Sequence, residues 1–175
     1  MKLYTKLLGN EFNLMPEALK KALAARYGFE ARGKFNVIHG KGINKIFAIL
    51  GGFPKAGKNI ETCLSVIPYG EKEIWLRTFN NKEFKSIMWE KEGLLYEKFR
   101  FTTHIFRLEP NDMGFQYIHI FSKFINIRLS RWLSFKIEGE VKGNSSGWEV
   151  KISVSSPVTG LIVSYRGNVD LANSI

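Results

Sequence analysis

The strongest constraint on the fold is an alternation of apolar and polar residues in the last third of the chain. Residues 133–142 alternate, residues 143–147 form a turn-like stretch of glycine, asparagine and serine, and the alternation resumes at residues 148–154. A period of two predicts β-strands with one polar and one apolar face. The chain is therefore expected to end in antiparallel strands that cover an apolar interior.

One register satisfies both faces of the first strand pair. Pairing Gly143 with Trp148 brings opposite charges together on the polar face. The same register places Val141 opposite Val150 on the apolar face. Because a slip of one residue would exchange the two faces, agreement on both faces specifies the register strongly.

A third strand, residues 160–171, extends this meander. If Ser155 pairs with Gly160, the apolar faces of the last two strands coincide, and Gly167 lies opposite Trp148. The ring of a tryptophan can cover the bare backbone of a glycine across a strand pair. The sequence therefore predicts a contact between these two residues.

Two short helices are predicted near the N-terminus, at residues 16–27 and 43–50, because each has an apolar stripe and is followed by glycine. Turn residues divide most of the remaining chain into short apolar segments rich in phenylalanine, which favours strands. The predicted strands are residues 34–39, 59–67, 71–79, 83–90, 93–108, 114–121, 132–142, 148–155 and 160–171.

A sheet with this many antiparallel strands needs to protect its edges, and strong curling or closure into a barrel achieves this. We therefore predict one domain over residues 1–175, of the α+β class and mostly β. Its centre is a curved or closed antiparallel sheet of eight to ten strands, a lipocalin-like barrel with one or two short N-terminal helices. A helix-grip fold is disfavoured because no long helix can follow Leu171.

Charge and composition limit the functional classes. The net charge of +10 indicates a basic protein, with either an anionic partner or a lysine-rich surface that maintains solubility. The lysines are scattered, which argues against nucleic acid as the partner. Cys63 is the only cysteine, as is typical of a reducing compartment. No apolar run has the length of a signal peptide or membrane span, so a cytoplasmic location is expected.

The clearest candidate site is an arginine among aromatic residues. Arg77 shares a predicted strand face with Trp75, and two hairpin turns bring further apolar residues and Glu97 to the same face. An arginine cannot lose its charge, so it needs an anion, either a ligand head group or Glu97 itself. Alternatively, its side chain reaches solvent at a rim. The candidate ligand-binding residues are Arg77, Trp75, Phe84, Met88, Glu97, Phe99 and Tyr165.

Two histidines form a second candidate site. A turn at residues 111–112 would place His104 directly opposite His119, an arrangement that could ligate a metal or sense pH. No third metal ligand is visible nearby, which favours an ordinary structural pair. The parity of the predicted strand 93–108 places the histidines on the face opposite Arg77, so two separate sites are expected.

A third candidate is the lysine-flanked apolar segment 41–50, which could lie on an anionic membrane surface. Ile43, Ile46, Phe47 and Leu50 form one stripe, however, and this favours a short core helix. Motifs for dinucleotide binding, phosphate loops and nucleophile elbows are missing from the sequence, and no cofactor is predicted.

Three short segments resemble a bacterial domain-of-unknown-function family, number four-one-six-six. They are residues 4–9, 75–79 and 156–167, and the resemblance covers nearly the whole chain. It implies no established activity. Some members look like extensions of saccharopine-dehydrogenase-like proteins, which implies a separate oxidoreductase-like partner chain here. The positions that match the family are Trp75, Arg77, Tyr165 and Gly167.

The leading functional hypothesis is that the concave sheet binds a small amphipathic or anionic molecule without catalysis. Arg77 would hold the polar group, while the aromatic residues around it would line the apolar part of the site. One alternative is an enzyme that uses Glu97 or the His104/His119 pair as acid or base. The other is a membrane-surface or protein-interaction module.

Overall fold

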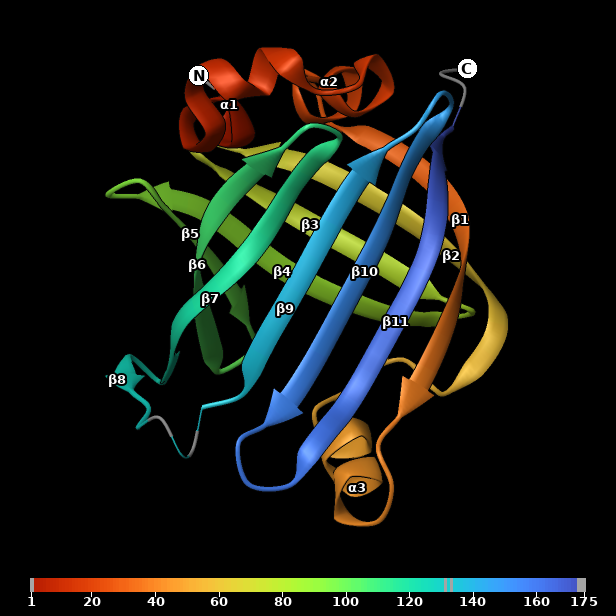
Figure 1. The fold of residues 1–175 in the computed structure, drawn as a ribbon, viewed down its shortest axis with the longest axis vertical. Coiled ribbons are helices and arrows are strands. Elements are labelled where there is room, and N and C mark those ends of the chain that lie inside the picture. Colours follow the sequence, from red (N-terminus) through yellow and green to blue (C-terminus); the bar gives the residue numbers. More distant parts are fainter. Residues whose placement is uncertain (1, 131, 133, 173–175) are drawn as a thin grey trace.

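The chain forms a closed antiparallel barrel of ten strands, seen from the side in Figure 1. The computed structural model describes residues 2–130, 132 and 134–172. Each strand pairs with its neighbours in sequence, apart from the short β8, which extends β7 alone. Pairing of β11 with β1 completes the ring. The strands are β1 Phe29–His39, β2 Gly57–Tyr69, β3 Lys72–Phe79, β4 Lys82–Lys91, β5 Leu94–Phe99, β6 Thr102–Asn111, β7 Gly114–Phe124, β8 Ile127–Arg128, β9 Lys136–Gly143, β10 Gly147–Ser156 and β11 Gly160–Leu171.

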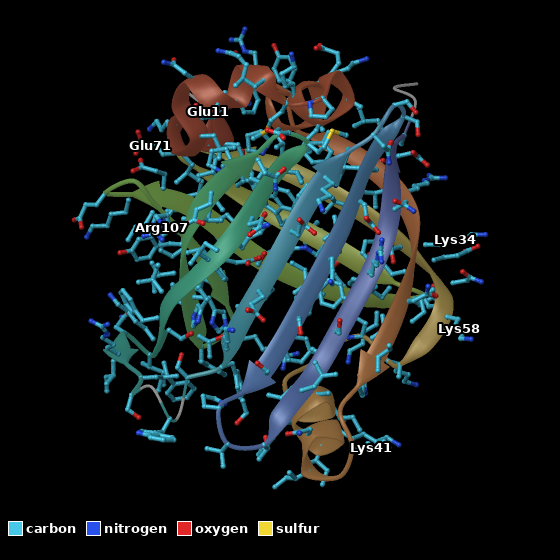
Figure 2. The ribbon with its side chains drawn as sticks, viewed as in Figure 1. Glu11, Lys34, Lys41, Lys58, Glu71 and Arg107 are labelled. Carbon is cyan, nitrogen blue, oxygen red and sulfur yellow. The ribbon has the colours of Figure 1, made fainter. Side chains whose placement is uncertain are left out.

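The alternation of residues fixes which face of each strand points inward. The registers predicted for β9–β10 and β3–β4 are confirmed, with Gly143 opposite Trp148 and Arg77 opposite Phe84. Charged residues project outward from the barrel wall, as Lys34, Lys58 and Arg107 do in Figure 2. The fold class predicted from the sequence is therefore correct.

The predicted strand 93–108 is wrong, because it is two strands with a sharp turn between them. β5 ends at Phe99 and β6 begins at Thr102, with Arg100 in the left-handed region at a φ of 45°. Left-handed backbone usually selects glycine or asparagine, so an arginine there gave no turn signal. The turn reverses the parity of all that follows, and His104 lies directly opposite Glu97.

Two further registers differ from prediction by an even number of residues. The β4–β5 turn lies at Glu92 and Gly93, so Met88 pairs with Glu97. A bulge after Val154 moves Gly167 opposite Val150 rather than Trp148. Phe35 on β1, and not Trp148, contacts the bare backbone of Gly167. Because both shifts are even, every side chain keeps its predicted face.

Three helical segments near the N-terminus cover one end of the barrel (Figure 1). They are α1 Leu3–Leu8, the 3-10 helix Gly9–Leu14 and α2 Glu17–Leu23. Only α2 was predicted, and it is shorter than expected. Tyr4, Leu8, Phe12 and Leu19 are buried against the barrel interior. The N-terminal helices thus close this end with apolar side chains.

The N-terminal parts of two strands also differ from expectation. β1 begins five residues earlier than predicted, at Phe29. β9 begins at Lys136, later than the predicted residue 132, while Leu133 of the predicted alternation lies outside the described residues. These differences leave the inward-facing positions of both strands unchanged.

The helix α3 Ile43–Leu50 lies at the other end of the barrel, where it contacts β11 and β1. It does not bury the predicted stripe: Ile43 and Ile46 are exposed, while Asn44 and Ala48 are buried. The Asn44 side chain donates a hydrogen bond to the carbonyl oxygen of Thr159 at 2.6 Å. This polar anchor on the β10–β11 turn sets which face of α3 points outward.

A tight backbone approach at Gly167 gives a stability prediction. A Cβ atom there would lie 2.3 Å from the carbonyl oxygen of Lys34 and 2.5 Å from Cγ of Phe35. Because that carbonyl belongs to the backbone of β1, Gly167→Ala should push β1 and β11 apart. We expect the free energy of unfolding to fall by about 2 kcal/mol, measured by urea denaturation.

The matched control for this measurement is Gly57→Ala. The nearest atoms to a Cβ at Gly57 belong to the flexible side chain of Ile60, at 3.3 Å and beyond. This variant should therefore retain nearly all of its stability. Equal losses in the two variants would show that the contact with β1 does not determine the effect.

Candidate functional site

The barrel encloses a cavity of about 640 Å³ that opens at the α3 end. Its walls are mostly aromatic and aliphatic, and Leu19 and Leu23 of α2 form part of the closed end. The lining residues that are exposed to solvent all lie at the α3 end: Gly51, Glu83, Lys85, Arg100, Phe101 and Phe124. Among the described residues, the route into the cavity therefore passes the turns beside α3.

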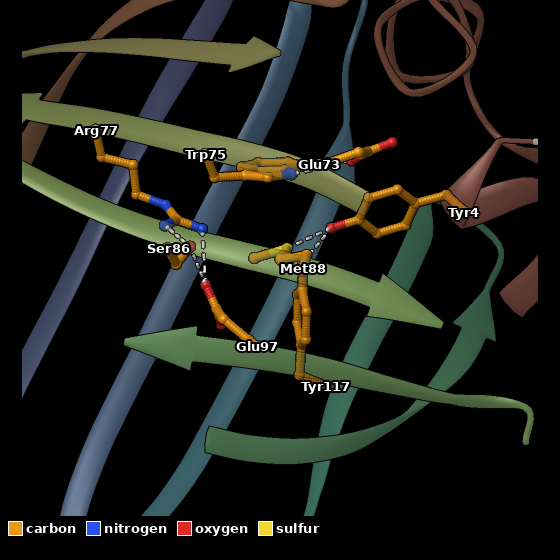
Figure 3. A network of polar contacts seen from close by, with 8 residues as sticks. All are labelled: Tyr4, Glu73, Trp75, Arg77, Ser86, Met88, Glu97 and Tyr117. Atoms are coloured by element: carbon orange, nitrogen blue, oxygen red, sulfur yellow. Dashed lines mark hydrogen bonds and ion pairs between the residues drawn. The ribbon is translucent and has the colours of Figure 1, made fainter. Parts of the chain in front are cut away.

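Arg77 lies inside this cavity, in an ion pair with Glu97. Its Nη2 donates to Glu97 Oε1 at 3.1 Å, and its Nη1 donates to Ser86 Oγ at 2.8 Å. Ser86 in turn donates to the same carboxylate oxygen at 2.8 Å. Figure 3 shows this triangle of residues from β3, β4 and β5. The Arg77 and Glu97 side chains are 17% and 10% exposed, so the pair is largely removed from bulk water.

Aromatic rings surround the pair and separate it from solvent. The Arg77 guanidinium carbon lies 5.2 Å from the ring centre of Trp75 and 5.9 Å from that of Phe99. Phe84 and Phe99 pack against each other at 4.6 Å between ring centres, on the side facing the opening. Cation–π contact and the ion pair together hold the guanidinium in a fixed position.

The structure brings the candidate ligand-binding residues together in one cavity. Arg77, Trp75, Phe84, Met88, Glu97, Phe99 and Tyr165 all line it, from the three neighbouring strands β3, β4 and β5 and from β11. The internal Arg77–Glu97 pair, considered as an alternative to ligand binding, is present as well. The two hypotheses are compatible, because an ion pair in a cavity wall still offers polar atoms to a ligand.

The histidines lie on the same interior face as Arg77, contrary to the predicted separation. His104 pairs with Ser122 across the β6–β7 ladder and not with His119 as predicted, because the turn lies at residues 112–113 and a bulge separates Ile105 from Phe106. Ser122 Oγ lies 2.8 Å from His104 Nδ1 and 2.9 Å from His119 Nε2, so the hydroxyl bridges the two rings. Within the described residues, no cluster of three metal-ligating side chains includes them.

Burial keeps both imidazoles uncharged near neutral pH. Desolvation, assisted by the neighbouring His119, lowers the pKa of His104 to about 4. Desolvation also lowers the pKa of His119, although less of its surface is buried. His104 lines the cavity and therefore offers it a neutral imidazole. Near pH 7 the two histidines therefore add no charge to the wall beside the Arg77–Glu97 ion pair.

Tyr4 is a buried residue that contacts two residues of the cavity wall, a placement that was not predicted. It comes from α1, and its hydroxyl lies 3.1 Å from the Tyr117 hydroxyl and 3.7 Å from the sulfur of Met88 (Figure 3). Burial raises the pKa of both tyrosines, so both hydroxyls keep their protons. The helix has no strand-like periodicity that could have placed Tyr4 here. Ser86 was also not singled out, since serine is common at surface positions.

The arrangement can bind a molecule with hydrogen-bonding and apolar parts. The bonds to Ser86 and Glu97 use two of the five N–H donors of the Arg77 guanidinium. They are the hydrogen bonds that this side chain makes within the described part of the chain. Glu97 Oε1 accepts from both partners, which ties its carboxylate to the wall.

Comparison with known proteins gives a family match. The family model described as Domain of unknown function (DUF4166) matches residues 15–169. No curated protein and no solved structure is significantly similar to the chain. Among the residues that the structure describes, no helix is long and apolar enough to cross a membrane.

Proposed function

We propose that this chain, which belongs to the DUF4166 family, binds one small amphipathic molecule in its barrel cavity without altering it chemically. The observation that supports this most is a charge-balanced ion pair in the wall of a mostly apolar cavity that is open at one end. Pockets lined by aromatic residues with a few converging polar groups are the usual form of small-molecule sites.

The charge balance favours an uncharged polar group on the ligand. An anion placed beside Arg77 would also lie close to Glu97, whose charge is only 3.1 Å from the guanidinium. In a cavity with a low effective dielectric, that repulsion offsets most of the attraction. A hydroxyl or carbonyl oxygen can instead accept from the N–H groups that Arg77 has left. We therefore narrow the expected ligand from amphipathic or anionic molecules to amphipathic molecules with a neutral polar group.

The cavity size limits the ligand. A volume of 640 Å³ corresponds to on the order of 20 waters at ~30 Å³ each. A chain of a dozen carbons with a small polar group fits such a space. Trp75, Phe84, Met88 and Phe99 would contact its apolar part, and the Arg77–Ser86–Glu97 cluster its polar group.

The hydrogen bonds that Glu97 and His104 already make favour ligand binding over the acid or base roles considered for these two residues. Glu97 accepts two hydrogen bonds from fixed donors, and His104 is tied to Ser122. An imidazole whose pKa is about 4 is a poor proton acceptor at neutral pH. A binding pocket needs no such transfer, since its polar atoms only have to stay in place.

Dodecanol binding to the purified protein tests this function. We expect one dodecanol per chain by native mass spectrometry, together with a change in tryptophan fluorescence, because Trp75 lines the cavity. Val150→Phe should fill part of the cavity and weaken binding at least tenfold. Lys151→Ala, whose side chain is exposed on the other face of β10, is the control and should bind normally.

The same experiment has a clear negative result. Unchanged binding to a correctly folded Val150→Phe variant would place the dodecanol outside the barrel. A folded wild-type protein that binds no dodecanol at any soluble concentration would also contradict the proposal.

A further inference from the structure

Exposed apolar side chains gather around the opening of the cavity. On α3, which lies at the end of the barrel away from α1 and α2 in Figure 1, Ile43, Ile46 and Ile49 are 54%, 55% and 58% exposed. The turns and strand ends at the same end of the barrel add more large apolar side chains. These are Phe101, Phe124, Ile125, Ile127, Trp132 and Val158. We call α3 and these residues the open rim.

The fold holds the isoleucines of α3 outward. Among residues 43–49 of this helix, Asn44 and Ala48 are the buried ones, and the hydrogen bond from Asn44 to Thr159 anchors that side to the barrel. The outward face therefore cannot turn into the core without breaking a polar contact. Exposed apolar side chains concentrated at one end of a folded protein mark an interaction site.

The open rim is also strongly cationic. The segments around the open rim are residues 40–58, 80–85, 98–102, 122–130, 132, 134–136 and 155–161, and within these described segments Glu83 is the only acidic residue. The exposed cations among them include Lys41, Lys45, Lys55, Lys58, Lys82, Lys85, Lys98, Arg100 and Arg128. The covered end of the barrel differs, since acidic residues such as Glu11 and Glu71 lie there while Lys41 lies beside α3 (Figure 2).

We propose that the open rim docks on the surface of a lipid bilayer that contains anionic lipids. Apolar side chains among lysines are the combination that binds the interface of such bilayers, the former in the acyl boundary and the latter at the head groups. Docking in this orientation places the cavity opening against the bilayer. An amphipathic ligand could then pass between bilayer and barrel without crossing water.

The positive charge of the open rim favours an anionic bilayer over a second copy of the chain as the docking partner. In a symmetric dimer built on this face, the lysines of one rim would meet the lysines of the other. Such like-charge contacts destabilise an interface. An anionic lipid surface supplies the opposite charge to every rim cation at once.

Cosedimentation with vesicles tests the proposal. The full chain should pellet with vesicles of phosphatidylcholine and phosphatidylserine, and much less with phosphatidylcholine alone. Lys41→Glu/Lys45→Glu and, separately, Ile43→Ser/Ile46→Ser/Ile49→Ser should each lower the partition coefficient at least tenfold. The control is Leu14→Ser/Lys21→Glu, which changes exposed residues of the same kinds at the covered end and should bind like wild type.

The depth of contact separates docking from simple charge attraction. Exposed Trp132 lies on the rim, so brominated phosphatidylcholine mixed with phosphatidylserine should quench its fluorescence, and Trp132→Phe should remove most of that quenching. Equal pelleting of the rim variants and the wild type would overturn the proposal. The proposal would also be overturned if the wild type did not bind vesicles and the rim variants changed the oligomeric state of the protein in ultracentrifugation.

Membrane docking and ligand binding can fail independently. The isoleucine variant of α3 changes no residue of the cavity wall, so it should bind dodecanol in solution as the wild type does. Loss of dodecanol binding in this variant would mean that the rim belongs to the ligand site itself, and would overturn docking as a separate role.

Discussion

Glu97→Gln should reverse the preference of the cavity from uncharged to anionic ligands. Glutamine keeps the size of the side chain and can still accept from Ser86, but it leaves the charge of Arg77 without a partner. A desolvated charge that has lost its partner carries a penalty of a few kcal/mol, which a carboxylate ligand can relieve. We expect the ratio of the affinity for dodecanoate to the affinity for dodecanol to be about 100-fold higher in Glu97→Gln than in the wild type. This change corresponds to ~2.8 kcal/mol.

Competition between dodecanoate and dodecanol, followed by native mass spectrometry, measures this reversal. Ser86→Ala is the matched control, because it removes two hydrogen bonds from the cluster and leaves both charges in place. It should weaken both ligands without changing their ratio. A wild-type protein that already prefers dodecanoate, or a Glu97→Gln variant with an unchanged ratio, would show that the ion pair does not set ligand charge.

The alternation of apolar and polar residues was sufficient to predict most of the fold and of the candidate site. Strand faces survive register errors of two residues, which is why the displaced partner of Met88 still left Glu97 on the inner wall beside Arg77. The predicted pocket residues therefore meet although the β4–β5 and β10–β11 registers were wrong. Matching charges on the outer face fixed the β9–β10 register completely.

The errors come from features that leave no periodic signal. The turn at Arg100 has neither glycine nor proline, although the Arg100 backbone lies in the left-handed region. Because this turn was not predicted, His104 was expected on the face opposite Arg77, whereas it faces the same interior. The outward face of α3 depends on the partner of Asn44, which is distant in sequence, and Tyr4 contacts the cavity-lining Tyr117 from a helix outside the strand pattern. Contacts between distant segments decide these placements.

A second large effect concerns acid stability, and it follows from the burial of His104. The pKa of this imidazole is about 4 in the folded protein and near 6.5 in an unfolded chain. Between these values the unfolded state binds more protons than the folded state, so stability falls as the pH falls. The stability that the neutral His104 contributes is fully present above about pH 6.5 and is lost near pH 4. It amounts to on the order of 3 kcal/mol in the free energy of unfolding.

Urea denaturation between pH 7 and pH 4 checks this effect, since the comparison with His104→Asn isolates one group. Asparagine can still bond to Ser122 but does not titrate, so the variant should lose much less stability across this interval. Burial raises the pKa of Glu73, which acts with the opposite sign and is present in both proteins. His119→Asn should remove a smaller part of the slope, because the His119 ring is less buried than that of His104. If the asparagine variant at 104 retained the full wild-type slope, the neutral imidazole in the cavity wall could not be the cause.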